Sequence, residues 1–454
     1  MILYDKKFQI VMHLYNTLMF FGIVLGFPVI IPAVLLSEKR RKTVLQRIGV
    51  ADAPTAIQHD KFRDQGINRV WIHALSVGEV ISAVPLVKEL NDACDHCDIF
   101  FSVSTKTGFE VANTLVKENV KQIFFFPYDL LISVKHIIGK IDPALVVVVE
   151  TDIWPNFLIE MKKRNIPVIL VNARLSQKSF CGYKNFSFFT KPLFSTFSKV
   201  CAQSMIDAER FRYLGIPLNK ITITGNVKFD QTYDPITKEE IERLRQWMNI
   251  RPRQKIFVAG STHKGEELIL ADAFRMIKKS FEDYLLIIAP RNVERTVSVY
   301  RIFKAAGFSV VRLKELNERA PGKRFEVIVI DEIGLLGRLY AFAEIAFIGG
   351  SLAPFGGHNP LEPAAFSKPI LFGPDMSDFE DISEKLLSSG GAIRVKDVQS
   401  LYRAMEMLIS DRKKAQEMGE NAYQVYNVNK GAAQRTLNVL AEYLNLIDRK
   451  QKET

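Results

Sequence analysis

The chain has 454 residues, of which 48% are hydrophobic and 24% are charged. This composition is typical of a globular protein and excludes a largely disordered chain, and the length exceeds what one ordinary hydrophobic core accommodates. The formal net charge is +11, with 61 basic and 50 acidic side chains. The positive excess favours an anionic partner, namely a phosphate, an anionic lipid or a nucleic acid, without selecting among them.

The first predicted element is an apolar helix near the amino terminus. No charged residue occurs from Phe8 to Ser37, and Met19–Leu36 is long and apolar enough to approach or cross a bilayer. The basic cluster Lys39–Lys42 follows, which predicts that the bulk of the chain lies on the cytoplasmic side. A cleaved secretory signal is the competing interpretation, but no small-residue cleavage site is present. Pro28 and Pro32 should kink the helix, so both a spanning and a partly inserted anchor stay open.

Only four cysteines occur, and no disulfide framework is expected in a large chain that faces the cytoplasm. Cys94 and Cys97 form a Cys-x-x-Cys pair, but no second pair at zinc-finger spacing accompanies it. A metal or redox role is therefore the minor interpretation, and the role of the pair stays open. We expect Cys181 and Cys201 to be small buried hydrophobic residues.

Two series of short β-branched runs alternate with helical stretches. The runs are apolar throughout and separated by crossover-length segments, which predicts parallel sheets covered on both faces. The first series comprises Val70–Ala74, Ile99–Ser104, Gln122–Phe126, Ala144–Glu150, Pro167–Asn172, Lys199–Ala202 and Ile221–Thr224. The second comprises Ile256–Gly260, Tyr284–Ala289, Phe308–Arg312, Val327–Ile330, Ile345–Ile348 and Pro369–Phe372. The sequence predicts an α/β protein of two doubly wound, Rossmann-like domains, with ligands beyond the carboxyl ends of the strands in an interdomain cleft.

The predicted segments follow one another along the chain. They are an anchor with its basic flank at 1–42, a Rossmann-like domain at 43–232, a turn-rich charged linker at 233–254, a second Rossmann-like domain at 255–431, and a closing segment at 432–454 with a helix over Ala432–Lys450.

Charged side chains follow several strands of the first predicted domain. Glu79 opens the helix after the first strand, and Glu150 and Asp152 follow the fourth. Arg174 follows the fifth strand and Lys228 the seventh, so two cations reach the edge that carries the acids. A helix-capping role explains Glu79 equally well, and structural ion pairs would explain the others. Charged residues at the ends of four strands of one sheet nevertheless indicate an active-site rim.

The second predicted domain shows phosphate-binding residue types at its strand ends. Ser261 and Thr262 follow its first strand, where hydroxyls and helix-terminal N–H groups hold phosphates, although a simple helix N-cap is the plainer interpretation. Arg291 follows the second strand, and its planar, permanently charged group suits a phosphate or nucleobase oxygen. No Walker lysine loop and no Gly-x-Gly-x-x-Gly helix start occur, which disfavours an ordinary NTPase or an NAD enzyme.

A glycine-rich block lies between Phe347 and Pro374. Gly349, Gly350, Gly356 and Gly357 are expected where the backbone turns sharply or approaches a ligand, and Asn359 and Glu362 then supply an amide and a carboxylate. Backbone N–H groups at the start of Pro360–Phe366 suit an anion. A plain connecting loop is the alternative. No metal signature occurs, and for His73 and His263 we expect hydrogen-bonding roles, not metal ligation.

Seven motifs occur in the order typical of one family. They are WIHALSVGEV at 71–80, VVVETDIWPN at 147–156, VNARLSQKS at 171–179, GNVKFD at 225–230, GSTHKGEE at 260–267, APRN at 289–292 and GGSLAPFGGHNPLEPAA at 349–365. Together they closely resemble the 3-deoxy-D-manno-oct-2-ulosonic acid (Kdo) transferases of Gram-negative lipopolysaccharide assembly. The resemblance covers about residues 71–374, and an amino-terminal anchor belongs to it.

The resemblance implies an inverting, metal-independent GT-B glycosyltransferase without a cofactor. It would transfer Kdo from CMP-Kdo to a hydroxyl of the lipid A precursor, on the cytoplasmic side of the inner membrane, with no nucleic-acid partner. The family's general base falls on Glu79, and two charge-stabilising residues fall on Glu150 and Lys228. Arg174 and the helix start near Ser261 and Thr262 would assist the departing phosphate.

The same resemblance places the CMP contacts. They fall on Pro290, Arg291, Ile333, Gly334, Leu335, Gly357, His358, Asn359, Pro360, Leu361 and Glu362. Ile333-Gly334-Leu335 departs from the usual Met-Gly-Glu, so a backbone contact there would survive and an acidic one would not. Asn292 replaces a usual histidine, and Asp152 stands where a glutamate is common.

Three other functions stay open on the sequence. One is a different GT-B enzyme, such as a nucleotide-sugar epimerase or a UDP-sugar transferase. Another is a membrane-tethered nucleic-acid or lipid-binding protein whose positive charge is the functional feature. The third is an inactive scaffold for outer-membrane assembly, against which the charged residues at the strand ends argue.

Overall fold

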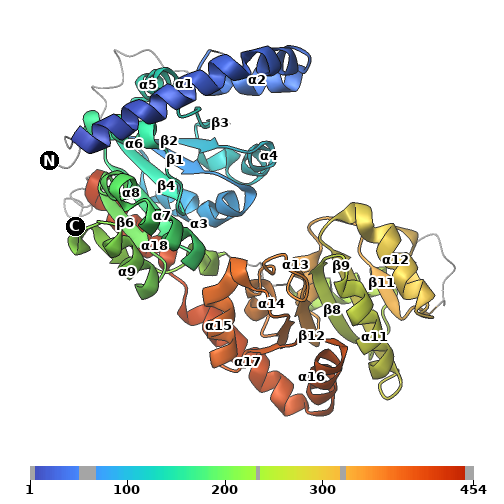
Figure 1. Cartoon of the computed structure of the whole chain (residues 1–454). Coiled ribbons are helices and arrows are strands. Elements are labelled where there is room, and N and C mark those ends of the chain that lie inside the picture. The colour runs from blue at the N-terminus through green and yellow to red at the C-terminus, as the bar shows by residue number, and fades with distance from the viewer. Residues whose placement is uncertain (1–5, 51–67, 232–235, 317–323, 445–454) are drawn as a thin grey trace. The chain divides into compact units, whose positions relative to one another are not determined.

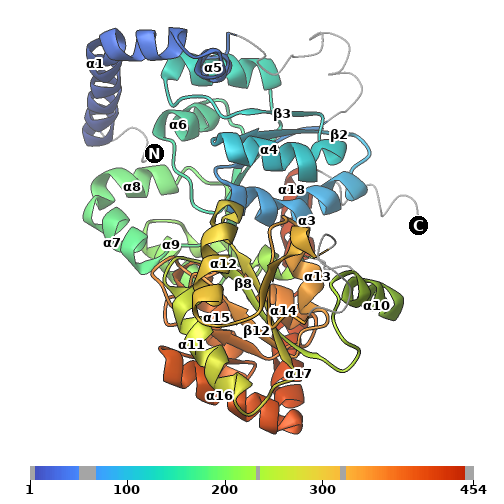
Figure 2. The ribbon, with the colours of Figure 1, turned by 90° about the vertical axis from the view of Figure 1, so that its right-hand side faces the viewer.

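The computed structural model describes residues 6–50, 68–231, 236–316 and 324–444. They divide into two compact units: unit 1 is formed by 1–231 together with 431–454, and unit 2 by 232–430. Each unit contains one seven-stranded sheet whose paired strands are all parallel. Helices flank both sheets in Figures 1 and 2. The predicted pair of doubly wound α/β sheets is confirmed.

The sheet of unit 1 has the order β3-β2-β1-β4-β5-β6-β7. Its strands are β1 (Asn68–Ala74), β2 (Cys97–Val103), β3 (Gln122–Phe125), β4 (Leu145–Val149), β5 (Val168–Ala173), β6 (Lys199–Ala202) and β7 (Ile221–Ile223). The central β4 is an unbroken LVVVV run that is buried on both faces, as β-branched residues in a covered parallel sheet should be. The chain leaves β1 towards β2 and later returns to β4 on its other side, so ligands are expected where β1 and β4 end.

The helices of unit 1 include one from the far end of the chain. They are α1 (Lys6–Leu35), α2 (Glu38–Arg47), α3 (Val77–Ala93), α4 (Lys106–Leu115), α5 (Leu131–Ile141), α6 (Pro155–Lys163), α7 (Gln177–Asn185), α8 (Ser187–Phe194), α9 (Met205–Tyr213), α18 (Ala432–Leu444) and the 3-10 turn η5 (Val227–Asp230). α18 packs against α3 and η5. Asp230 accepts the backbone N–H groups of Gly431 and Ala433, so the returning chain is tied to unit 1 (Figure 1).

The sheet of unit 2 has the order β10-β11-β9-β8-β12-β13-β14. Its strands are β8 (Lys255–Thr262), β9 (Tyr284–Pro290), β10 (Val310–Arg312), β11 (Val327–Val329), β12 (Ile345–Ile348), β13 (Ile370–Phe372) and β14 (Ala392–Arg394). The sequence missed β14, which is three residues long and follows two serines and two glycines. The chain runs from β8 to β9 on one side and later returns to β12 on the other side of β8, so ligands are expected where β8 and β12 end.

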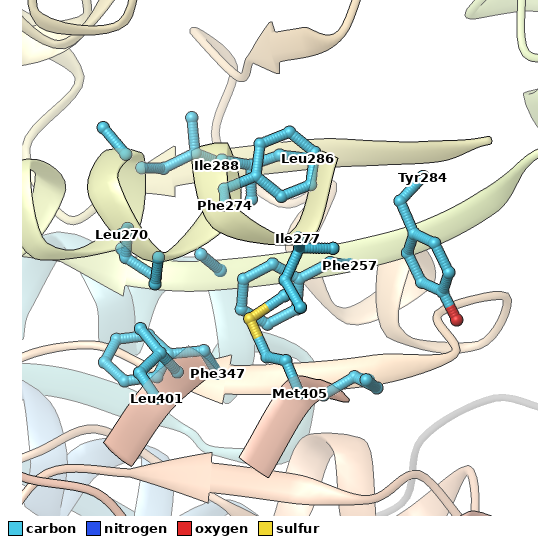
Figure 3. Close-up of a cluster of buried hydrophobic side chains, with 14 of the residues drawn as sticks. Phe257, Leu270, Phe274, Ile277, Tyr284, Leu286, Ile288, Phe347, Leu401 and Met405 are labelled. Carbon is cyan, nitrogen blue, oxygen red and sulfur yellow. The ribbon is translucent and has the colours of Figure 1, made fainter. Parts of the chain in front are cut away.

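Helices cover the second sheet through an aromatic and aliphatic core. They are α10 (Lys238–Trp247), α11 (Glu266–Lys278), α12 (Thr296–Ala305), α13 (Leu336–Tyr340), α14 (Leu361–Ala365), α15 (Glu380–Ser388), α16 (Val398–Ser410) and α17 (Arg412–Val428). Phe274 of α11 and Met405 of α16 meet Phe257 and Phe347 of the sheet in this core (Figure 3). This burial holds the carboxyl ends of β8 and β12 in place.

The segment expected to be a linker is partly helical. α10 lies inside 233–254 and belongs to unit 2, and residues 232–235 are outside the description. Thr237 and Glu240 form a reciprocal capping box that starts α10. The sequence contains this signature within a segment whose high charge favours a linker.

The amino-terminal and cysteine predictions need three corrections. Within the described residues, Lys6–Pro28 is long and apolar enough to cross a membrane and few of its residues are buried, and α1 starts well before Met19. Cys94 and Cys97 are joined by a disulfide in the turn between α3 and β2, where their Cα atoms lie 5.5 Å apart. Cys181 is exposed, whereas Cys201 is buried as predicted.

Candidate functional site

Three carboxylates gather where β1 and β4 of unit 1 end. Glu79 lies in the first turn of α3, directly after β1, and Glu150 and Asp152 follow β4. Burial raises the pKa of Glu79 to about 8, and the negative charges of Glu150 and Asp152 add to this rise. A carboxyl group with a pKa near neutrality, held among like charges at a ligand-binding edge, suits proton transfer.

Glu79 also makes local contacts that resemble helix capping. Its carboxylate accepts hydrogen bonds from the backbone N–H of Leu75 and, at 3.4 Å, from the hydroxyl of Ser76. These bonds oppose the rise in the pKa of Glu79. These local bonds orient the Glu79 carboxylate, and they do not account for its raised pKa.

Glu150 is held in an uncommon backbone conformation. Its φ is 60°, in the left-handed region, and its N–H donates to the carbonyl of Val171. Such a conformation costs a non-glycine residue on the order of 1–3 kcal/mol and is concentrated at functional sites. Lys228 Nζ lies 3.9 Å from Glu150 Oε1, which brings together two residues that the sequence predicted for the rim.

Two asparagines hold Lys228 at this edge. The Asn226 side chain accepts the N–H of Lys228 at 3.0 Å, and the fully buried Asn172 accepts the N–H of Val227 at 3.2 Å. η5 is thereby fixed next to α3. The sequence placed Asn172 and Asn226 beside the rim without a role. The partner of Asn172 is a backbone group 55 positions away, which no local pattern indicates.

A buried histidine braces the loop after β4. His73 is fully buried, with Nε2 3.1 Å from Asp152 Oδ2 and Nδ1 3.0 Å from Ser102 Oγ. Trp154 Nε1 donates to the same Asp152 oxygen at 2.7 Å. The hydrogen-bonding role predicted for His73 is confirmed, and Asp152 is occupied by two donors.

The backbone of Arg174 lies at the same edge of the sheet. Its carbonyl accepts the Thr151 hydroxyl at 2.5 Å, which joins the loop after β5 to the loop after β4. Its side chain is half-buried, and its charge acts on Asp207. Asp207 in turn accepts the N–H of Leu175 at 2.9 Å.

In unit 2, one fully buried carboxylate ties two loops together. Glu266, the first residue of α11, accepts the backbone N–H groups of His263, Gly350, Ser351 and Leu352 at 2.7–3.0 Å. It therefore joins the end of β8 to the glycine-rich loop after β12. The sequence contained Glu266 within a motif and gave it no role, since full burial of a carboxylate cannot be read from the pattern.

The glycines of this loop are needed for the chain's own packing. A side chain at Gly349 would collide with the backbone of Ser261, and one at Gly357 would collide with Met376. Gly357 also has a φ of 73°. Close backbone approach was predicted correctly, but the group approached at Gly349 is the neighbouring strand end, not a ligand.

Arg291, His358 and Glu362 come together at this edge. Burial raises the pKa of Glu362 to about 7, and the positive charge of Arg291 opposes this rise. Burial, together with the charges of Arg291 and His263, lowers the pKa of His358 to about 4. His263 Nε2 lies 2.8 Å from His358 Nε2, and the His263 ring stacks on Phe355 with centroids 4.1 Å apart. The hydrogen-bonding role predicted for His263 is confirmed.

Other predicted binding residues take different places. Ser261 and Thr262 lie inside β8, and Gly265 precedes α11, so the helix N-cap interpretation is wrong. α14 has five residues, and the Asn359 side chain already accepts the N–H of Leu361 at 3.0 Å, so the expected anion site at this helix start is not supported. Three further candidates differ in surroundings: Pro290 is buried at the end of β9, Ile333 is 92% exposed, and Gly334 has a φ of 90°.

The part of the chain that is described holds no group of three or more histidine, cysteine, aspartate or glutamate side chains able to bind a metal ion.

Sequence comparison places this geometry among known proteins. A family described as "3-Deoxy-D-manno-octulosonic-acid transferase (kdotransferase)" matches residues 42–231. The chain is 36% identical over 377 residues to the 3-deoxy-D-manno-octulosonic acid transferase of Haemophilus influenzae, covering 83% of this chain and 87% of that one. It is 31% identical over 439 residues to the enzyme of the same name from Rickettsia bellii, covering 96% and 99%.

Solved structures share the fold at low sequence identity. A glycosyltransferase from Rickettsia africae matches with a TM-score of 0.57 and 15% identity, over 83% of this chain and 99% of its own. The UDP-GlcNAc 2-epimerase from Neisseria meningitidis matches with a TM-score of 0.57 and 14% identity, over 82% and 100%. These likenesses show a GT-B-like fold and leave the reaction open.

Proposed function

This chain belongs to the 3-deoxy-D-manno-octulosonic acid (Kdo) transferase family, and we propose that it transfers Kdo from CMP-Kdo to a hydroxyl of the lipid A precursor with inversion, releasing CMP. The observation that carries the mechanism is the environment of Glu79. Its pKa of about 8, its neighbours Glu150 and Asp152, and its position beyond β1 support its role as general base.

The reaction needs a base for the attacking alcohol and stabilisation for two developing charges. Glu79 takes the proton of the acceptor hydroxyl as its oxygen bonds to the anomeric carbon. The bond between that carbon and the phosphate oxygen breaks, and CMP leaves with the electron pair. Lys228, beside Glu150 at 3.9 Å, supplies positive charge to the departing phosphate, and Glu150 stabilises the positive character of the sugar.

We assign the nucleotide to unit 2. Arg291 supplies a planar set of donors, and Glu362 and His358 lie within its electrostatic reach. Asn359, Pro360, Leu361, Gly357 and Pro290 complete the proposed CMP contacts, with Ile333, Gly334 and Leu335 contributing through the backbone. Thr262 is fully buried, so we do not place it against the ligand surface.

The acceptor explains why the enzyme would be bound to the inner membrane. A lipid A precursor stays in the bilayer, and α1 supplies the apolar helix while Lys39–Lys42 attract anionic head groups. Ile153, in the loop that carries Glu150, packs against the cluster of Phe8 and Met12 from α1. This contact supports an acceptor site that opens towards the membrane near the anchor, on the cytoplasmic side.

The test is a transfer assay with purified, detergent-solubilised protein. We expect CMP-Kdo and a tetra-acylated lipid A precursor to give a product whose mass rises by whole Kdo units, with one CMP released for each. The proposal includes metal independence, so the rate should persist in excess EDTA. Turnover with a UDP-sugar in place of CMP-Kdo, or no Kdo transfer at all, would reject the assignment.

The control is a second carboxylate on the same helix. Glu89 lies on α3 like Glu79 but is exposed. Glu79→Gln should slow transfer strongly while Glu89→Gln keeps the parental rate, with both variants showing the thermal unfolding of the parent. A Glu79→Gln variant with parental turnover would show that the base is another group.

A further inference from the structure

The first half of α1 is packed onto unit 1. Phe8 is 3% exposed and Met12 8% exposed, and both pack with Leu193 of α8. The Phe8 ring lies 6.1 Å from that of Phe189. This segment belongs to the apolar stretch that is long enough to cross a membrane.

Polar bonds hold the same half-helix. Tyr15 Oη donates to Asp129 Oδ2 at 2.9 Å, and Asn156 Nδ2 donates to Asn16 Oδ1 at 2.8 Å. Asp129 also accepts the N–H groups of Asn156 and Phe157 at 2.9 Å, at the start of α6. These partners are buried groups of the α/β unit, so Tyr15 and Asn16 lie at the surface of that unit.

The chain that follows α1 returns to the same place. The carbonyl of Arg47, at the end of α2, accepts the N–H of Tyr128, and its guanidinium lies 4.9 Å from the centroid of the Tyr128 ring. Tyr128 precedes Asp129, to which Tyr15 is bonded. Residues 15 and 47 are therefore fixed at neighbouring positions of unit 1, and Figures 1 and 2 show α1 and α2 on the same side of it as α5 and α6.

This geometry is incompatible with a helix that crosses the bilayer. A span over Lys6–Pro28 is about 34 Å long, close to the thickness of the hydrocarbon core, and would put Tyr15 and Asn16 near the bilayer centre. A span over Met19–Leu36 would put the start of α2 beyond the core. α2 covers only about 15 Å, roughly half of the core, and could not bring Arg47 back to Tyr128.

We propose that α1 is embedded in one leaflet of the membrane without crossing it, so that the amino terminus lies on the same side as the two α/β units. This rests on the membrane attachment in the proposed function. The lipid-facing surface is the stripe opposite the docked face, formed by Ile10, Leu14, Leu18, Phe21 and Leu25, which are 53–77% exposed. Their spacing of three and four residues places them on one face of the helix.

The experiment maps the side on which the start of α1 lies. Lys6→Cys is built in a Cys181→Ser background, because Cys181 is exposed, Cys201 is buried, and Cys94 and Cys97 are paired. Lys414→Cys, on an exposed position of unit 2, reports the side of the α/β units. A membrane-impermeant maleimide is applied to spheroplasts and to inverted inner-membrane vesicles. We expect both positions to react in inverted vesicles alone, whereas reaction of the Lys6→Cys variant in spheroplasts would overturn the proposal.

A second pair tests the docking itself. Asn16→Cys with Asn156→Cys, in the same background, should form a cross-link with a short bis-methanethiosulfonate in intact membranes, because the parent side chains touch at 2.8 Å from Asn156 Nδ2 to Asn16 Oδ1 and the reagent bridges the two thiols. Failure to form it in folded, membrane-bound protein would also overturn the proposal. Flotation with vesicles separates the two proposals: protein that does not float contradicts membrane attachment, whereas protein that floats with its start exposed in spheroplasts contradicts only the one-leaflet placement.

Discussion

The two units use the same edge of the same kind of sheet in different ways. In unit 1, burial together with the negative charges of Glu150 and Asp152 raises the pKa of Glu79 to about 8. In unit 2, Glu266 is fully buried and satisfied by four backbone N–H groups. One carboxylate is poised to exchange a proton, whereas the other holds the backbone in position.

The two carboxylates suit different tasks, proton transfer for Glu79 and support of a binding loop for Glu266. A general base works best with a pKa near the operating pH and with a hydrogen-bonding capacity left for substrate. A loop that holds a nucleotide needs fixed backbone donors and little freedom, which a buried carboxylate provides. We therefore expect substitutions in unit 1 to affect turnover and substitutions in unit 2 to affect nucleotide affinity.

The largest expected effect is that of Glu79→Gln. Loss of the base should lower kcat by roughly 100- to 10,000-fold, with the affinity for CMP unchanged because the nucleotide is assigned to unit 2. Single-turnover transfer and calorimetric CMP binding measure the two quantities. A loss of CMP affinity as large as the loss of rate would contradict the assignment of turnover to unit 1 and of nucleotide binding to unit 2.

Lys228→Met should come next. Removing one positive charge aimed at the departing phosphate should lower kcat by roughly 100- to 1,000-fold. Lys220, in the same unit but after α9, serves as the control through Lys220→Met. An equal loss in both variants would mean that the general positive charge matters, and not the position beside Glu150.

Glu266→Gln tests whether the bonds of Glu266 to the glycine-rich loop of unit 2 support nucleotide binding. Glutamine offers one acceptor oxygen where the carboxylate offers two, and each buried N–H left without a partner costs about 1–3 kcal/mol. We expect CMP to bind roughly 10- to 100-fold more weakly, with kcat at saturating donor changed far less. Glu282→Gln, at an exposed position before β9, is the control. A fall in kcat with unchanged CMP affinity would contradict the proposed binding role.

Much of this arrangement could be predicted from the sequence, and the limits are physical. Thirteen of the strands and the carboxylates at the ends of β1 and β4 follow from apolar runs and from what comes directly after them. The hydrogen bonds that Glu266 accepts from Gly350, Ser351 and Leu352 could not be predicted, because these residues lie more than eighty positions away in the chain. The short β14 carries no periodic signal, and Ser261 looked like a helix cap because β8 continues two residues past the predicted strand end.

The pH dependence of transfer tests the coupling between Glu79 and Glu150. In the free enzyme kcat/KM should rise with pH through about 8, because the base must be deprotonated. Glu150 raises the pKa of Glu79, so in Glu150→Gln the rising part of the pH–rate profile should move to lower pH. The pH at which kcat/KM rises can be measured even though Glu150→Gln is expected to have a lower maximal rate. If kcat/KM rose at the same pH in Glu150→Gln as in the parent, a group other than Glu79 would be titrating.

The smallest expected effect is that of His358→Gln on nucleotide binding. His263 and His358 share one hydrogen bond between their Nε2 atoms, and burial, with a smaller effect of Arg291, keeps the pKa of both below the ordinary value. A bound phosphate would favour protonated imidazole, so CMP should bind more tightly as the pH falls from 7 to 5, by a few-fold at most. His358→Gln should flatten this dependence while the affinity at pH 8 stays the same, and calorimetry at the three pH values measures it. An unchanged slope would place the phosphate away from the histidine pair and leave Arg291 as its main partner in unit 2.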